Sequence, residues 1–554
     1  MRRFPLAVVG AVAFALVAAG CSSDPVTDPD NDVTFTSCSS ADCAGTLPGG
    51  AEFDIILPED WNGTLAIYSH RIDGPGALPA NEVPAQDEPA TDEATSPPPG
   101  LGDDEAGDEK KGVKDDQASN KRKKDRAAAT PSPTPVDPPV EPRPGGPELA
   151  PMWGRGDRTI ADVMLQAGYA IAGATPSGQG WVVADQIQAA EELHQYFSET
   201  IGEPNRVYAW GESTGGLASA RLAQLHPEWV SGALAMCAPL SGPLRSYDLA
   251  LDVAYATREL LATDLKLVGY ATEDEARRNR EVALRALQEA ADGPLAEQAK
   301  VAFIAGIGDL PNDSRTIAGA TWPDQIKANL EAIRNLIDQS TVQRYDLEQR
   351  SGGNFSGNAG TDYALRISDI QRRQLDEIRK GLADAFLVKL GSGVRVTPDP
   401  AAVERAEQQG TLDGNLEVPT VTLHNSIDPV YIAPNVSSYR SLLATGDPET
   451  IGNLVEIFVL PPSSVSESDP AAEGVGNCNF ESRTVLGAMI QLNQWVRNGV
   501  YPGRDTAQAA FKGQNVSLEY DPGPWPQMSA TATETEAASA RLPGEAAGHE
   551  EDRS

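Results

Sequence analysis

The sequence predicts an α/β fold: a mostly parallel sheet that carries a large helical insertion. Short apolar strands alternate with amphipathic helices between residues 158 and 236, a spacing typical of parallel sheets. From 239 to 416 this alternation gives way to Ala-, Leu-, Glu- and Arg-rich helical windows. Strand patterns then resume at Pro419–Leu423 and Leu454–Leu460. The insertion therefore divides one sheet rather than joining two separate folds.

The elements of the sheet follow from short apolar runs and the turns that separate them. The predicted strands are Ala51–Leu57, Thr64–Ser69, Tyr169–Ala174, Arg206–Trp210 and Val230–Met236, besides the two after the insertion. The predicted helices of the core are Ile160–Ala167, Asp185–Thr200, Leu217–Leu225 and Thr484–Asn498. Those of the insertion are Leu249–Leu261, Asp274–Ala291, Gln325–Ile337 and Ile370–Phe386.

Composition excludes several classes of function. The chain has 554 residues with 44 Lys+Arg against 80 Asp+Glu, a formal net charge of −36. This acidic surplus argues against nucleic-acid binding, which needs a basic surface for the phosphates. The 5 cysteines and 5 histidines form no metal-binding spacing, and no Gly-rich phosphate loop is present. We therefore expect neither a metal nor another cofactor.

Two segments lack the apolar residues that a packed core needs. Residues 74–147 consist mainly of Pro, Asp, Glu, Gly, Ala and Lys, and the chain after Tyr520 is acidic and Ala-rich. Such segments cannot bury enough surface to offset the entropy of ordering, so we predict that both are disordered. The predicted organisation is a signal peptide at 1–20, a tether at 21–32, core at 33–73, a disordered insertion at 74–150, core at 151–238, a helical cap at 239–416, core at 417–520 and a disordered tail at 521–554.

The N-terminus reads as an export signal. Arg2 and Arg3 precede an apolar run, Phe4–Ala19, that is shorter than most bilayer-spanning helices. The small residues at its end are followed at once by Cys21, which resembles the bacterial lipobox, in which this cysteine is lipidated. We expect a lipoprotein anchored to the outer face of the bacterial cell membrane. The alternative is plain secretion with cleavage near Gly20.

Export places the remaining four cysteines in an oxidising space, where thiols tend to pair. Cys38 and Cys43 lie in a Ser-rich segment that reads as a polar loop, and we expect them to close it locally. Cys237 and Cys478 would then pair across the fold. The alternative for this second pair is two buried thiols.

One motif points to chemistry. The strand Arg206–Trp210 runs directly into Gly211-Glu212-Ser213-Thr214-Gly215, and a helix follows. This is G-x-S-x-G in its required context of strand, sharp turn and helix, where the serine is an exposed nucleophile. The backbone N–H of Thr214 would then stabilise an oxyanion. The alternative is a purely structural turn.

Around this motif the chain resembles secreted bacterial α/β-hydrolases of the esterase and peptidase type. The resembling stretches are WNGTLAIYSH, VYAWGESTGGLASARLAQLHPEWVSGALAMCAPLSG, VPTVTLHNSIDPVY and VGNCNF. The resemblance implies an α/β-hydrolase fold, a catalytic triad in the order Ser, Asp, His, and a helical cap ahead of the acid. It also implies that His70 and Arg71, at the end of a strand, form the second part of the oxyanion hole.

The resemblance supplies the acid but not the base. Asp428, in D-x-V after the strand Pro419–Leu423, matches the family's acid, although an Asx turn before Pro429 would look the same. Where these hydrolases have G-H-C, this chain has Gly476-Asn477-Cys478. An amide cannot accept a proton at neutral pH. His424, four residues before the acid, is the fallback base, while His549 lies in the acidic tail.

Two hypotheses for function follow. The first is a serine hydrolase that cleaves an ester or amide in a small molecule or peptide, with Ser213 as nucleophile and Asp428 orienting a base. The second is a catalytically impaired surface lipoprotein that kept the pocket and binds its ligand. Asn477 separates them, because only the first needs a histidine within reach of Ser213.

Overall fold

The computed structural model describes residues 26–28, 33–39, 42–70, 160–176, 178, 180–311, 321–462, 472–501 and 503–526. The signal peptide, Cys21, Arg71, the acidic insertion and the tail with His549 lie outside these residues, so the predictions about them stay predictions. In the part of the chain that is described, no helix combines the length and apolarity needed to cross a bilayer.

An 11-stranded sheet forms the core, in the order β1-β2-β3-β4-β6-β5-β7-β8-β9-β10-β11. The strands are β1 (Val26–Asp28), β2 (Val33–Ser39), β3 (Asp42–Thr46), β4 (Glu52–Ile56), β5 (Thr64–Ser69), β6 (Tyr169–Thr175), β7 (Arg206–Glu212), β8 (Val230–Met236), β9 (Thr420–Asn425), β10 (Leu454–Val459) and β11 (Val516–Ser517). All pairings from β6 to β10 are parallel, while β1 to β4 and β11 pair antiparallel at the two edges. The predicted mostly parallel α/β sheet is confirmed.

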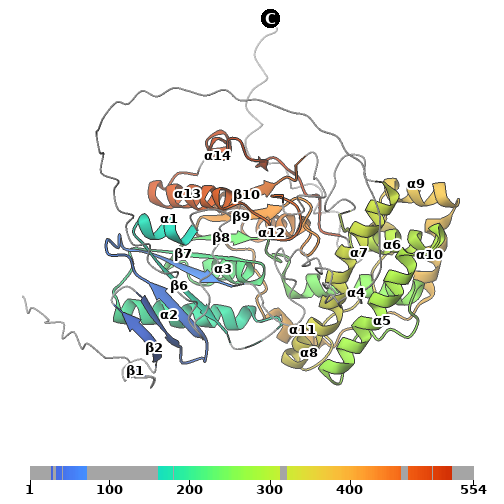
Figure 1. Ribbon diagram of the computed structural model, residues 1–554, viewed down its shortest axis with the longest axis horizontal. Helices are drawn as coiled ribbons and strands as arrows, with labels where there is room; N and C mark the ends of the chain where they lie inside the picture. The colour runs from blue at the N-terminus through green and yellow to red at the C-terminus, as the bar shows by residue number, and fades with distance from the viewer. Residues whose placement is uncertain are drawn as a thin grey trace, which may run out of the picture. The chain divides into compact units, whose positions relative to one another are not determined.

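Helices cover both faces of this sheet (Figure 1). On one face lie α1 (Ile160–Gln166) and α13 (Ser482–Asn498), whose apolar side chains join a cluster with Leu234 and Ile457. On the other lie α2 (Val183–Thr200) and α3 (Thr214–Leu225), packed on Ile67 and Ala209. Because both faces are covered, the central strands are apolar throughout, and every residue of β5 is buried. This is the α/β-hydrolase fold that the resemblance implies.

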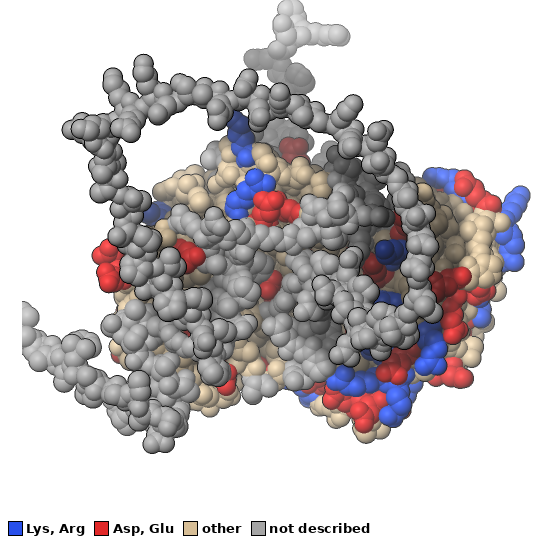
Figure 2. Space-filling view, viewed as in Figure 1, with Lys and Arg blue, Asp and Glu red and all other residues tan. Residues whose placement is uncertain are grey.

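The helical cap is confirmed between β8 and β9, and it has an apolar core of its own. Its helices are α4 (Gly242–Leu260), α5 (Glu273–Ala291), α6 (Leu295–Ile307), α7 (Trp322–Asp338), α8 (Arg344–Ser351), α9 (Asp369–Ile378), α10 (Leu382–Ser392) and α11 (Pro400–Glu407). Acidic and basic side chains are interspersed over α5, α9 and α10, at the right of Figure 2. Two further helices, α12 (Pro434–Thr445) and α14 (Arg504–Ala510), lie after β9 in the chain.

Two predictions about secondary structure are wrong. The segment with Cys38 and Cys43 is not a loop: it forms β2 and β3, and the two cysteines are opposite each other in the register. The prediction failed because Ser and Thr are frequent in turns. In the structure β3 also pairs with β4 on its other side, and this pairing holds it in the sheet. The predicted helix Ile370–Phe386 is two helices, because the chain turns at Gly381 with φ 74°.

Candidate active site

Ser213 lies at a sharp turn between β7 and α3. Its φ of 55° and ψ of −128° are unfavourable for a residue with a side chain, as expected of a nucleophile elbow. The flanking glycines make this turn possible, because the turn packs against the end of β5. A Cβ added at Gly211 would lie 2.4 Å from the Ser69 carbonyl oxygen, and one at Gly215 would lie 2.0 Å from it. Each glycine of the motif is therefore required by close backbone packing.

The same packing places β5 beside the predicted oxyanion-binding groups. Thr214 is the first residue of α3, so its N–H belongs to the helix terminus where partial positive charge gathers. The His70 backbone lies against the elbow, since a Cβ at Gly215 would come within 2.6 Å of its carbonyl oxygen. That carbonyl accepts a hydrogen bond from Gln186 Nε2, which fixes the orientation of the peptide. Arg71, the other predicted contributor, is outside the described residues.

Asp428 is fully buried on the loop that follows β9. Its Oδ1 accepts hydrogen bonds from the backbone N–H groups of Val430, at 2.8 Å, and Tyr431, at 3.0 Å. Burial raises the pKa of this carboxyl to about 7, although these hydrogen bonds and those from Asn477 and the Cys478 N–H favour the charged form. Among the described residues no cation contributes to this pKa, and the hydrogen bonds offset the cost of burial only in part.

Asn477, at the position where the resemblance predicts a histidine, contacts the predicted acid. Its Nδ2 donates to both oxygens of Asp428, at distances of 3.1 and 2.9 Å. The loop is held in place by Asn425, whose Nδ2 donates to the Gly476 carbonyl at 2.9 Å. The amide therefore reproduces the link between base and acid, but it has no basic atom to offer Ser213.

His424, the fallback base, is directed to the backbone. It is fully buried, and its Nε2 lies 2.7 Å from the carbonyl oxygen of Tyr431. Because a carbonyl can only accept, Nε2 carries the proton and cannot take another. Burial lowers the pKa of the imidazole to about 4, so it stays neutral at physiological pH.

Tyr431 connects the groups around the nucleophile, and sequence reasoning missed it. The Ser213 side chain lowers the pKa of the Tyr431 hydroxyl and so opposes part of the effect of burial, the Tyr431 N–H donates to Asp428 and its carbonyl accepts from His424. Burial raises the pKa of the phenol to about 12, so it is neutral. The only signal in the sequence was its place three residues after the predicted acid, where a core aromatic would look the same.

The disulfide between Cys237 and Cys478 is confirmed, with Cα atoms 5.3 Å apart. Cys237 follows β8 and Cys478 follows Asn477, so the bridge ties the loop of the base position to the sheet beside the elbow. The predicted Cys38–Cys43 bridge stays a prediction, because the side chain of Cys38 is outside the described residues.

Within the described part of the chain, the one group that could hold a metal is Glu212 with Cys237 and Cys478, and disulfide sulfurs are not thiolate ligands.

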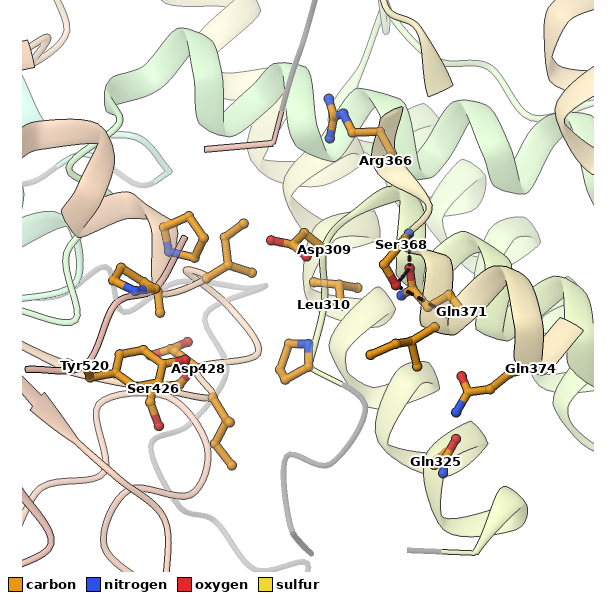
Figure 3. Close-up of a pocket in the computed structure, with 17 residues that line it drawn as sticks. Asp309, Leu310, Gln325, Arg366, Ser368, Gln371, Gln374, Ser426, Asp428 and Tyr520 are labelled. Atoms are coloured by element: carbon orange, nitrogen blue, oxygen red, sulfur yellow. Dashed lines mark hydrogen bonds between the residues drawn. The ribbon is translucent and has the colours of Figure 1, made fainter. Parts of the chain in front are cut away.

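A cavity of about 590 Å³ adjoins the acid loop (Figure 3). Its walls come from three parts of the chain: the loop after β9, the cap, and the segment around Tyr520. Asp428 lies on one wall, and Asp309 and Arg366 of the cap lie across from it. A volume in this range accommodates a ligand of a few hundred daltons.

Comparison with known proteins found solved structures that resemble this chain only at low similarity. No protein-family model matches this chain, and no curated protein does. An esterase from Aspergillus oryzae is 11% identical, covering 87% of this chain and 85% of its own, with a TM-score of 0.32. Feruloyl esterase B from the same organism is 11% identical, covering 87% and 86%, with a TM-score of 0.33. Tannin acyl hydrolase from Aspergillus niger is 11% identical, covering 87% and 82%, with a TM-score of 0.30. The function of this α/β-hydrolase-fold chain must therefore be argued from its own site.

Proposed function

We propose that this protein is a base-deficient serine hydrolase, which takes up an ester or amide at Ser213 and turns it over slowly. One observation carries the proposal: the amide of Asn477 is bonded to Asp428 where a histidine would complete the triad. The position of Ser213 at a strained strand–helix turn, and of Asp428 on the loop after β9, supports the view that a carbonyl compound can still be positioned. Only the group that accepts the proton is lost.

The chemistry explains why turnover would be slow. Attack by Ser213 Oγ on the carbonyl carbon forms the new C–O bond and pushes charge onto the carbonyl oxygen, which the Thr214 N–H would stabilise. The hydroxyl proton has to leave at the same stage. Asn477 cannot accept it, and Tyr431 is itself a neutral phenol with a pKa of about 12. Loss of a triad member costs roughly 10⁴–10⁶ in turnover, and the same loss would slow hydrolysis of the acyl-enzyme.

The second candidate is a surface protein that binds such a ligand without cleaving it. The same contact between Asn477 and Asp428 favours it, because a partly buried amide–carboxylate pair stabilises the loop without any catalytic use. The two proposals differ in the reactivity of Ser213. In the first, Ser213 reacts slowly with electrophiles; in the second, it does not react.

A fluorophosphonate probe separates them. Phosphonylation of Ser213 involves the same elbow and oxyanion-binding groups as acylation, and the product is stable enough for intact-protein mass spectrometry. We expect slow labelling of the wild type and none of Ser213→Ala. If prolonged exposure of folded wild-type protein gives no adduct, the hydrolase proposal fails and the binding protein is favoured.

We further propose that the protein is exported and anchored through a lipid on Cys21. The support is the charged start, the apolar run Phe4–Ala19 and the small residues before this cysteine. In a bacterial host, metabolic labelling with an alkynyl fatty acid should tag the wild type in the membrane fraction. Cys21→Ser should lose the tag. A tagged Cys21→Ser protein, or an untagged wild type, would contradict the anchor.

A further inference from the structure

Asp309 faces the cavity from the cap, opposite the loop that bears Asp428 (Figure 3). It follows α6 directly after Gly308, which is the C-cap of that helix. Three features of this place are unfavourable for an aspartate. Together they raise the free energy of a charged aspartate at this position.

The first cost is conformational. Asp309 has φ 51°, in the left-handed region that glycine adopts most easily and that aspartate adopts more readily than most other residues, so this cost is small. The second is electrostatic, because the C-terminus of a helix carries partial negative charge and repels a carboxylate. The third is partial desolvation: although the side chain is exposed in the open cavity, the surrounding protein raises the pKa of this carboxyl to about 6, against the opposing effect of Arg366. A glycine or asparagine at 309 would avoid most of these costs.

Among the residues that the structure describes, no basic side chain forms an ion pair with Asp309. Arg366, a basic residue on the cavity wall, lowers the pKa of Asp309 through its charge, but its guanidinium is bonded to Asp252 at 2.8 Å and to the Ile307 carbonyl at 3.0 Å. Asp252 and Arg366 are both buried, so this pair is fixed. Asp309 forms no salt bridge with any residue that the structure describes. The carboxylate is left facing a space large enough for a ligand.

We propose that the cavity binds a ligand that carries a primary ammonium group, and that Asp309 is the residue that pairs with it. The cavity also offers amide side chains, such as Gln374, and apolar ones, such as Ile432, which suit the neutral remainder of such a ligand. The amide and apolar side chains carry no charge, so neither forms an ion pair with the ammonium group. The site goes beyond the proposed function, because binding here does not require Ser213 to react.

The test compares two probes that differ only in charge, 4-phenylbutylamine and 4-phenylbutanol. Their dissociation constants for the full-length protein are measured by calorimetry or ligand-observed NMR at neutral to slightly alkaline pH. We expect the amine to bind at least about tenfold more tightly than the alcohol, since a partly buried ion pair is worth more than one in water. In Asp309→Asn this preference should fall close to one.

Asp292→Asn is the matched control. Asp292 is, like Asp309, an exposed aspartate at the C-terminus of a cap helix, in this case α5, but it does not line the cavity. It should keep the preference for the amine. Asp309→Asn should also raise the melting temperature, because it removes the charge from the helix terminus and keeps a residue that tolerates this φ.

The outcomes are distinct. An equal preference for the amine in wild type and Asp309→Asn, or no binding of the amine at about 10 mM, overturns the proposal. Should Asp309→Asn not fold, Asp309→Gly gives the same comparison, since glycine accepts φ 51° without strain. Ser213→Ala protein should bind both probes like the wild type, so failure of the hydrolase proposal leaves this result unaffected.

Discussion

The Asn477 side chain donates hydrogen bonds to both carboxylate oxygens of Asp428, and the adjacent Cys478 is bonded covalently to Cys237. The loop of the base position is thus fixed at two points beside the elbow. Under the proposed function, the side chain at 477 is the group that a triad would need to have changed. A single substitution at residue 477 can therefore test whether a base is the missing group.

The buried carboxyl of Asp428 predicts a specific dependence of stability on pH. Its pKa is about 7 in the folded protein and about 3.9 when unfolded, so the folded state binds the proton more tightly. The contribution of this group to stability is fully present below about pH 4 and is lost as the pH rises to about 7. Denaturant unfolding of wild type and Asp428→Asn at pH 5 and pH 8 measures it. The wild type should be more stable relative to the variant at pH 5 than at pH 8; an equal difference at both would contradict this.

Removal of the Cys237–Cys478 bridge should destabilise the protein. The two cysteines are 241 residues apart, so the bridge constrains a long loop in the unfolded chain, and its loss should cost ~2–5 kcal/mol. The double variant Cys237→Ser/Cys478→Ser is compared with the wild type by denaturant unfolding. Cys38→Ser/Cys43→Ser serves as control, since those residues are close in sequence. Non-reducing peptide mapping should recover the 237–478 pair, and a free thiol at either position would count against it.

His424 should not be the base. It is bonded to a backbone carbonyl through a protonated Nε2 and has a pKa of about 4. His424→Gln should lose some stability through the altered buried hydrogen bond, about 1–3 kcal/mol. Per folded molecule, its esterase rate should stay within about tenfold of the wild type, well short of the loss expected for a triad base. A fast wild-type enzyme that His424→Gln inactivates would identify His424 as the base and refute our interpretation of Asn477.

The acidic insertion should be dispensable for folding. Residues 74–147 contain almost no large apolar side chain and fall between two elements of the core. Limited proteolysis should cut there first, and deletion should leave the melting temperature nearly unchanged. A fall of more than roughly 5 °C, which corresponds to over 1 kcal/mol, would show that the segment packs on the core.

The sequence predicted the central strands and the elbow well because their signals are local. Thr64–Ser69 and Val230–Met236 are apolar runs with clear turn boundaries, and the structure has both with the same ends. The pair β2 and β3 was missed, since its Ser- and Thr-rich sequence carries no apolar run and its pairing depends on β4. Local pattern cannot show an edge hairpin that is held by its neighbours.

At the site, residues fixed by a motif could be predicted and those fixed by tertiary contact could not. Gly211, Ser213 and Gly215 belong to one short turn, so their roles follow from sequence. Tyr431 and Asp309 do not: each owes its position to the cap or to the loop after β9, and neither belongs to a motif. Their significance depends on hydrogen bonds and on a cavity that only the folded chain creates.

If the lack of a base limits turnover, as proposed, Asn477→His should restore part of it. A histidine at this position would accept the proton of Ser213, with Asp428 fixing its tautomer and the disulfide holding its loop. Hydrolysis of an aryl ester such as p-nitrophenyl acetate is measured for wild type and Asn477→His, each with and without Ser213→Ala. We predict a gain of at least ~10²-fold that Ser213→Ala abolishes. A folded Asn477→His protein that is no faster than the wild type would contradict the account.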